Sequence, residues 1–173
     1  MQVSIRKFEL SDVENKVKWI NDPKNNKYLH YDLPLEVEKT KLWFEKNHTR
    51  EDRYDAVIEV DGVPVGLIGL LSIDMKNLKA EYYVCIGEQF AKGKGVAFSS
   101  SKLLLEYAFD VLHLNKIYLY TEFENVATQK LAEKIGFENE GLLKEDLIYN
   151  GRKVDRFFYG ITKQRYKDVS DVD

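Results

Sequence analysis

The segment that most constrains the fold of this chain is an apolar run followed by a glycine-lysine turn and an amphipathic pattern. The run Tyr82–Ile86 is typical of a β-strand, and apolar residues at helical spacing follow from Gly95 to Leu112. The turn between them contains Lys92-Gly93-Lys94-Gly95. A strand, a glycine turn and a helix in this order predict a nest of backbone amides at a helix N-terminus, which suits an anionic phosphate.

Apolar periodicity divides the rest of the chain into strands and helices. Alternation of period two predicts strands at residues 3–8, 54–60, 64–73, 79–86, 116–121, 137–147 and 156–161. Spacing of three and four predicts helices at residues 13–20, 36–47, 95–112 and 126–134. The strand before the glycine turn, its helix and the next strand form a βαβ unit. We therefore expect one mixed α/β domain with a right-handed parallel crossover.

Composition excludes several classes of protein. The 173 residues are enough for one domain with a core, and 44% apolar with 32% charged residues is typical of a globular chain. The single cysteine, Cys85, excludes an internal disulfide framework, and His30, His48 and His113 lack metal-ligand spacing, so we expect no metal. The net charge of −3 argues against a nucleic-acid partner. With no secretory or membrane-spanning segment, we expect a cytoplasmic protein that does not contact a membrane.

Two motifs resemble those of one family, the GCN5-related N-acetyltransferases (GNAT family). Residues 92–97 resemble its Gln/Arg-x-x-Gly-x-Gly/Ala pyrophosphate loop, with Lys92 where Gln or Arg is usual. Thirty residues beyond Gly95, the segment Asn125–Phe137 resembles the family's Asn-helix-Glu-Lys-x-Gly-Phe motif. The segments Trp19–Pro23, Glu140–Leu143 and Asn150–Arg152, with Asp155, resemble the branch that acetylates ribosomal protein N-termini, polyamines and some nucleotide-linked amino sugars. The resemblance extends over residues 2–162.

The resemblance implies a single-domain GNAT fold over residues 1–162, followed by a charged C-terminal tail at residues 163–173. The central sheet of that fold is mixed, mostly antiparallel and twisted. It has about six to seven strands with a splayed parallel pair, and about four helices accompany it. Dimers are common in the family, so a homodimer is compatible with the resemblance.

The resemblance also implies that the chain binds acetyl-coenzyme A as its acetyl donor. The pyrophosphate would contact the amides of the glycine-lysine loop, and the pantetheine arm would lie along the preceding strand. The residues that we expect to bind the coenzyme are Val84, Cys85, Ile86, Lys92, Gly93, Lys94, Gly95, Val96, Ala97 and Asn125. Cys85 is expected to be a small buried residue and not a nucleophile, because direct acetyl transfer needs no acyl-enzyme.

The implied reaction is direct attack of a neutral primary amine on the thioester, which requires a base. Glu81 is the first candidate, directly or through a water, although it equally fits a structural glutamate that anchors the sheet. Asp32 and Glu122 are weaker candidates and are expected at the surface. Many family members carry a tyrosine as general acid at the position of Ala132. Either no side-chain acid is used here, or a tyrosine such as Tyr120 or Tyr118 replaces it.

The acceptor is not resolved by the sequence. Tyr28, His30 and Tyr31 are expected to line the acceptor pocket, by analogy with the family. A protein or peptide N-terminus, a polyamine or other small-molecule amine, and a nucleotide-linked amino sugar all remain open. The aromatic loop slightly favours the sugar, because its rings could stack on one. The alternative function is a non-catalytic acyl-CoA-binding module, which only Ala132 supports.

Overall fold

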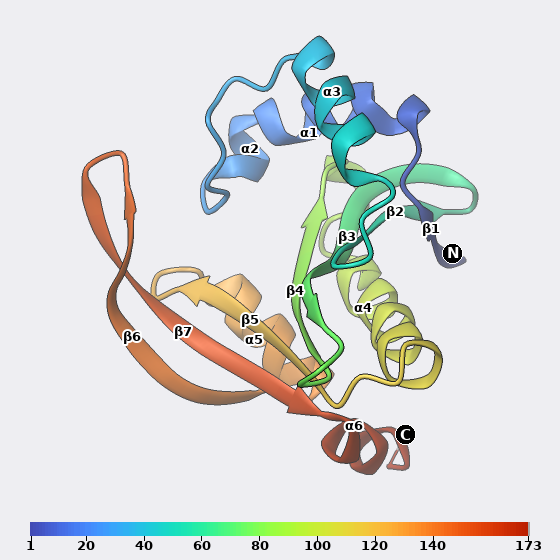
Figure 1. The fold of residues 1–173 in the computed structure, drawn as a ribbon, viewed down its shortest axis with the longest axis vertical. Helices are drawn as coiled ribbons and strands as arrows, with labels where there is room; N and C mark the ends of the chain where they lie inside the picture. The colour runs from blue at the N-terminus through green and yellow to red at the C-terminus, as the bar shows by residue number, and fades with distance from the viewer. Residues whose placement is uncertain (173) are drawn as a thin grey trace. The chain divides into compact units, whose positions relative to one another are not determined.

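The computed structural model describes residues 1–172, and the chain divides into two units (Figure 1). The first unit holds Met1–Leu71 and Tyr83–Leu104, and the second holds Ser72–Tyr82 and the chain from Leu105 onward. Strand β4 (Lys79–Ile86) therefore begins in the second unit and ends in the first. Among residues 1–172, no helix is long and apolar enough to span a bilayer.

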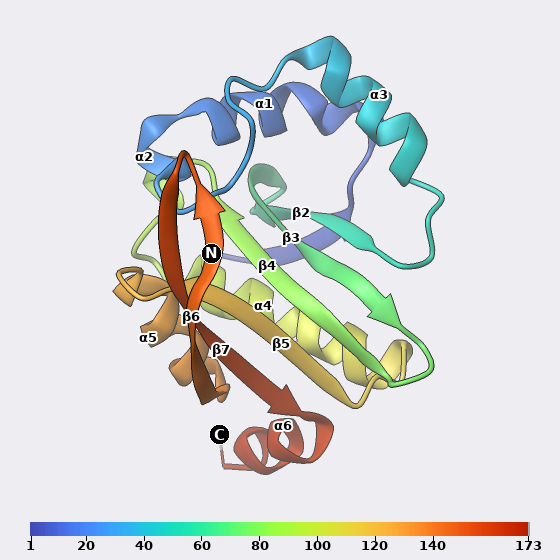
Figure 2. The same ribbon diagram turned by 60° about the vertical axis from the view of Figure 1, so that its left-hand side comes forward.

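The first unit combines antiparallel strands with helices. Its elements are β1 (Val3–Lys7), η1 (Leu10–Asp12), α1 (Val13–Asn21), α2 (Pro23–Asn26), α3 (Val37–Asn47), β2 (Tyr54–Val60), most of β3 (Val63–Asp74), η2 (Gln89–Ala91) and most of α4 (Val96–Glu106). Strand β2 pairs with β1 and β3, and Asp61 and Gly62 adopt the positive φ angles that a two-residue hairpin turn requires. Helices α1 and α3 pack side by side (Figure 2). Their apolar faces share a buried cluster of Phe8, Val13, Trp19, Ile20, Val57 and Leu67.

The second unit is built on the start of β4 and a long hairpin. Its elements are η3 (Tyr107–Val111, a π-helical turn), β5 (Lys116–Glu122), α5 (Val126–Ile135), β6 (Glu138–Tyr149), β7 (Arg152–Thr162) and α6 (Lys163–Ser170). The parallel ladder between β4 and β5 ends at the pair Glu81↔Tyr118, whereas β5 pairs with β7 along its whole length. Gly136, at φ 117°, ends α5 as expected of a C-terminal glycine.

The observed sheet confirms the predicted fold class. The strand order is β1-β2-β3-β4-β5-β7-β6, in which β4 and β5 are parallel and the pairs β1-β2, β2-β3, β5-β7 and β6-β7 are antiparallel. Among the described residues there are six α-helices where about four were expected. The additions are the single turn α2 and helix α6, which forms from the charged tail. Helix α6 is stabilised by its N-cap Thr162, which accepts a hydrogen bond from the Arg165 amide, and by Tyr166, whose ring lies 5.1 Å from that of Phe109.

Candidate functional site

The glycine-lysine loop forms the expected nest of backbone amides in the first unit. Gly93 and Gly95 have φ of 72° and 77°, and a Cβ added at either would meet no atom within 4 Å. None of the backbone N–H groups from Gly93 to Ala97 makes a well-formed hydrogen bond with another of the described residues. They lie at the N-terminus of α4, where the helix dipole is positive. The loop therefore offers several donors and an unobstructed approach to an anion.

The side chain of Lys92 already donates hydrogen bonds to other residues of the protein. Its ammonium lies 2.5 Å from Oδ1 of Asn25 and 3.2 Å from the carbonyl oxygen of Lys24, and both acceptors belong to α2. Its backbone amide donates to the carbonyl of Gln89 at 3.2 Å. The amide nest consequently begins at Gly93, and Lys92 ties the loop to α2.

The strand before the loop approaches its neighbour closely. Val84, Cys85 and Ile86 are half-buried, and a Cβ at Gly66 would lie 2.4 Å from the carbonyl oxygen of Cys85. Glycine is therefore required at this point of β3. Burial raises the pKa of the Cys85 thiol to about 11, against a lowering effect of Lys92. At neutral pH the thiol is protonated, which disfavours a role as nucleophile.

The aromatic loop contributes to a cluster of titratable groups in the first unit. Burial, with the charges of Cys85 and Asp55 adding to it and that of Arg53 opposing it, raises the pKa of Tyr31 to about 12. Tyr83 donates a hydrogen bond of 2.6 Å to Asp55. Of the three predicted acceptor residues, Tyr28 and Tyr31 are half-buried and His30 is exposed.

A buried lysine in the same unit was not anticipated. Lys16 is 7% exposed, and its ammonium lies 3.3 Å from the ring centroid of Trp43, 5.8 Å from that of Phe8 and 5.9 Å from that of Tyr31. Burial lowers its pKa to about 8. The signal was present in the sequence, because Lys16 shares the apolar face of α1 with Val13 and other buried residues.

The candidate base lies in the second unit. Glu81 is half-buried opposite Tyr118, and burial raises the pKa of its carboxyl while the charge of Arg156 lowers it. Tyr120 occupies the same face of β5 as Tyr118, since the residues alternate along a strand. The rings of Tyr118, Tyr120 and Phe158 have centroids 5.3 to 5.9 Å apart, and the Arg156 guanidinium lies 4.3 Å from the Tyr120 centroid. The structure thus brings Glu81 and Tyr120 onto one aromatic face.

Three other positions discussed from the sequence, Asn125, Ala132 and Glu122, also lie in the second unit. Asn125 is half-buried and caps α5, with its Oδ1 accepting a hydrogen bond of 3.3 Å from the Thr128 amide. Ala132 is 1% exposed. The expectation that Glu122 lies at the surface is wrong, because its side chain is 3% exposed. It lies at the end of β5, where its backbone pairs with that of Arg156 in β7 and its carboxylate forms an ion pair with Arg152 of the same strand β7. Asp32, in the first unit, is exposed as expected.

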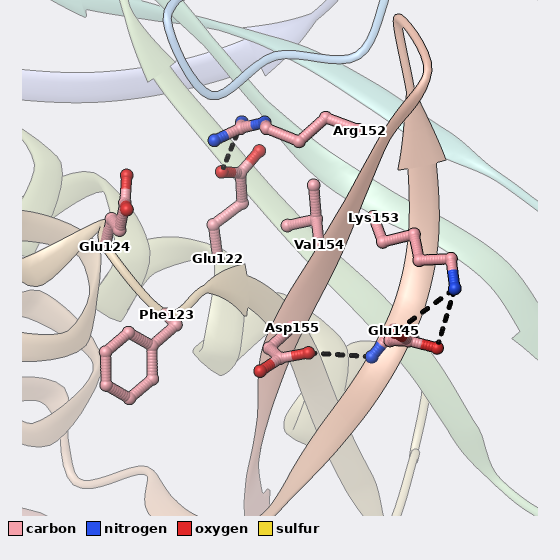
Figure 3. A pocket seen from close by; sticks show the side chains of 8 residues that line it. All are labelled: Glu122, Phe123, Glu124, Glu145, Arg152, Lys153, Val154 and Asp155. Atoms are coloured by element: carbon pink, nitrogen blue, oxygen red, sulfur yellow. Dashed lines mark hydrogen bonds and ion pairs between the residues drawn. The ribbon is translucent and has the colours of Figure 1, made fainter.

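A cavity of about 280 Å³ opens between the end of β5 and the β6–β7 hairpin of the second unit (Figure 3). Glu122 and Arg152 point toward one another there, with 3.5 Å between Oε2 and a guanidinium nitrogen. The residues that line the cavity are Glu122, Phe123, Glu124, Glu145, Arg152, Lys153, Val154 and Asp155. Sequence reasoning did not identify this cavity, because its walls come from segments that pair only in the folded sheet. Among the described residues, no group of His, Cys, Asp and Glu side chains could hold a metal ion.

Comparisons with known proteins agree with the motifs. The family model of the acetyltransferase (GNAT) domain matches residues 2–138. Spermidine N(1)-acetyltransferase of Escherichia coli (strain K12) is 32% identical over 152 residues, which cover 87% of this chain and 80% of the relative. A putative ribosomal N-acetyltransferase of Bacillus subtilis (strain 168) is 32% identical over 113 residues, covering 65% and 61%.

Solved structures share the fold. The spermidine N-acetyltransferase of Vibrio cholerae, crystallised in complex with CoA and spermine, superimposes with a TM-score of 0.88 at 28% identity, covering 96% of this chain and 98% of that one. The family match spans most of the chain, and the two motifs that carried the resemblance both lie within it. The chain therefore belongs to the GNAT family and is an acetyl-CoA-dependent N-acetyltransferase.

Proposed function

We propose that this enzyme acetylates a primary amine of a linear aliphatic polyamine. The observation that carries this acceptor class is the 32% identity with a spermidine N(1)-acetyltransferase over 87% of the chain. This similarity outweighs the slight preference for an amino sugar that the aromatic loop suggested. A peptide N-terminus is the second candidate, supported by the similarity to a putative ribosomal N-acetyltransferase.

The proposed coenzyme site rests on the amide nest. Acetyl-CoA supplies an activated thioester when bound. The N–H groups of Gly93 to Ala97 would donate to its pyrophosphate, and the backbone of Val84, Cys85 and Ile86 would align its amide-rich arm. Asn125 uses its Oδ1 as the cap of α5, which leaves its side-chain amide group as a donor to the coenzyme. The positive φ angles and the clear space beyond both loop glycines support this fit.

We propose Glu81 as the general base and Tyr120 as the residue able to protonate the leaving thiolate. Because burial raises the pKa of Glu81, its carboxylate is a better proton acceptor than an exposed glutamate. Aliphatic amines are mostly protonated at neutral pH, so a base that removes a proton from the acceptor increases the reactive fraction. Ala132 carries no hydroxyl, which leaves Tyr120 or unassisted departure of the thiolate. We also propose that the acceptor contacts Tyr28, His30 and Tyr31.

A panel of acceptors tests the function. Release of coenzyme A from acetyl-CoA should be fastest with spermidine or spermine, slower with ribosomal peptides and slower still with nucleotide-linked amino sugars. If acetyl-CoA binds but no amine is acetylated, the non-catalytic acyl-CoA-binding module is correct instead. The cytoplasmic location and the homodimer stay predictions, and light scattering of the purified protein checks the latter.

Two substitutions test the residues. Gly95→Val should abolish coenzyme binding by placing a side chain where the pyrophosphate approaches. Gly62→Val is the matched control, since Gly62 also has a positive φ and clear space around it but lies in the β2–β3 turn. Glu81→Gln should lower kcat/KM most below pH 8, where the amine is protonated. Asp32→Asn, at an exposed carboxylate, should leave the pH profile unchanged.

A further inference from the structure

A positive charge without a counter-charge of its own lies inside the first unit, on the inner face of α1. Lys16 is 7% exposed, and the rings of Trp43 and Phe8 have centroids 3.3 and 5.8 Å from its ammonium. Among residues 1–172, this ammonium forms no hydrogen bond or ion pair. The charge of Asp55 acts on it, but both carboxylate oxygens of Asp55 accept hydrogen bonds from Arg53, at 2.7 and 2.9 Å. Because Arg53 balances Asp55, the charge of Lys16 remains uncompensated.

The other titratable groups of this region are neutral at physiological pH. Tyr31 lies in the loop between α2 and α3, and its ring centroid is 5.9 Å from the Lys16 ammonium. Tyr83 and Cys85 of β4 pack against the same buried cluster, and the Tyr83 hydroxyl donates to Asp55. Burial raises the pKa of Tyr31 to about 12, that of Cys85 to about 11 and that of Tyr83 well above the usual tyrosine range. None of these groups therefore offsets the positive charge at pH 7.

This charge adjoins one of the proposed acceptor contacts. An acceptor amine in contact with the Tyr31 ring would lie roughly 9 Å from the Lys16 ammonium, and two like charges at that separation shift each other's protonation by about one pH unit at an effective dielectric constant of about 20. A neighbouring positive charge disfavours the protonated form of an amine. Only the neutral amine attacks the thioester, so the charge increases the reactive fraction of the bound acceptor and weakens the binding of its ammonium form.

We propose that the Lys16 ammonium makes an acceptor amine seated against Tyr31 lose its proton more readily and thereby prepares it for attack on the thioester. The inference rests on the proposed function, because it takes Tyr31 as an acceptor contact. The proton of the amine passes to the general base or to water, and Lys16 keeps its own, so Lys16 acts through its charge alone. Burial lowers the pKa of Lys16 to about 8, so its charge is present at neutral pH, where aliphatic amines are mostly protonated, and is lost as the pH rises above 8.

Steady-state kinetics with spermidine as the acceptor test this role. At pH 7, Lys16→Met should lower both kcat and KM about tenfold, because the protonated amine binds more tightly and loses its proton less readily. At about pH 10, where Lys16 is uncharged, the variant should match the wild type. Lys16→Arg keeps the charge and should retain both constants at pH 7. Lys18→Met is the matched control, because it removes a 64% exposed charge from the same helix and should change neither constant.

The comparison of the two pH values separates an effect of charge from a loss of packing. A fall in kcat and KM of Lys16→Met at pH 7 that disappears at about pH 10 supports the inference. No change at pH 7, a lower kcat with an unchanged KM, or the same loss at both pH values overturns it. If Lys16→Arg does not fold, the pH comparison of Lys16→Met decides alone. A ribosomal peptide serves as a second acceptor: if it is acetylated and spermidine is not, the proposed polyamine acceptor fails, and the same comparison on the peptide decides the role of Lys16.

Discussion

Replacing Lys16 with methionine tests whether a buried ammonium in an aromatic cage stabilises this fold. Burial lowers the pKa of Lys16 from 10.5 to about 8, a difference that corresponds to about 3 kcal/mol against the charged form. The attraction to the Trp43 ring, at 3.3 Å, offsets this by up to about 2 kcal/mol. Methionine fills similar space without charge. We therefore expect Lys16→Met to raise the free energy of unfolding at pH 7 by about 1 kcal/mol.

The sign of the pH dependence of the unfolding free energy follows from the pKa of Lys16. Since the pKa of Lys16 is lower in the folded state, the unfolded chain binds more protons between pH 8 and 10.5, and wild-type stability should rise with pH in that window. Cys85 acts in the opposite direction above pH 9, because its pKa is raised on folding. Both proteins contain Cys85, so the difference between them isolates Lys16. The advantage of Lys16→Met should shrink as pH rises from 8 to 10.5.

Urea unfolding followed by circular dichroism at a series of pH values measures this difference. Lys18→Met is the control on the same helix, since Lys18 is 64% exposed and should show no such pH-dependent gain. A Lys16→Met protein that is less stable than the wild type at every pH, by a constant amount, would refute the reasoning. The ammonium would then be a net stabilising part of the cage.

Three further predictions concern individual residues. The Cys85 thiol should react with iodoacetamide about a hundredfold more slowly in the folded than in the unfolded protein at pH 8, because its pKa is raised from 9.0 to about 11; similar rates would contradict its burial. Gly87→Ala should lower stability by roughly 2 kcal/mol in thermal unfolding, because the new Cβ would lie 2.1 Å from Cγ of Trp19. Asn125→Ala should cost about 1 kcal/mol through loss of the α5 cap, whereas Asn125→Asp should retain it.

Local patterns predicted the elements well. The loop at residues 92–97, the Asp61-Gly62 hairpin and the Gly136 helix end depend on backbone preferences that neighbouring residues determine, and each appears in the structure. The expected strands and the main helices also follow from apolar spacing within single segments. Such features need no knowledge of distant contacts.

Features that depend on distant pairing were missed. Glu122 is buried at the end of β5, where its partner in the β5–β7 ladder is Arg156 and its ion-pair partner is Arg152, both at least 30 residues away in sequence. Helix α6 has a charged sequence and gains its stability from Phe109 and from the carbonyl of Gly136, which Arg165 reaches at 3.3 Å. Lys16 was overlooked because a lysine on an apolar face is ordinarily exposed, and only the fold supplies its aromatic neighbours.

Because Lys92 is hydrogen-bonded to α2, replacing this lysine with arginine would change more than the contact with a phosphate. A lysine ammonium has three N–H donors, and two of them already serve Asn25 and Lys24. Asn25 in turn donates to the carbonyl oxygens of Trp19 and Gly87, so one amide side chain joins α1, α2 and the loop. An arginine at position 92 has five donors in a rigid fork and could hold α2 and a phosphate at once. Lysine allows fewer simultaneous contacts, so in this chain the choice of cation sets how firmly the first helices are attached to the phosphate loop.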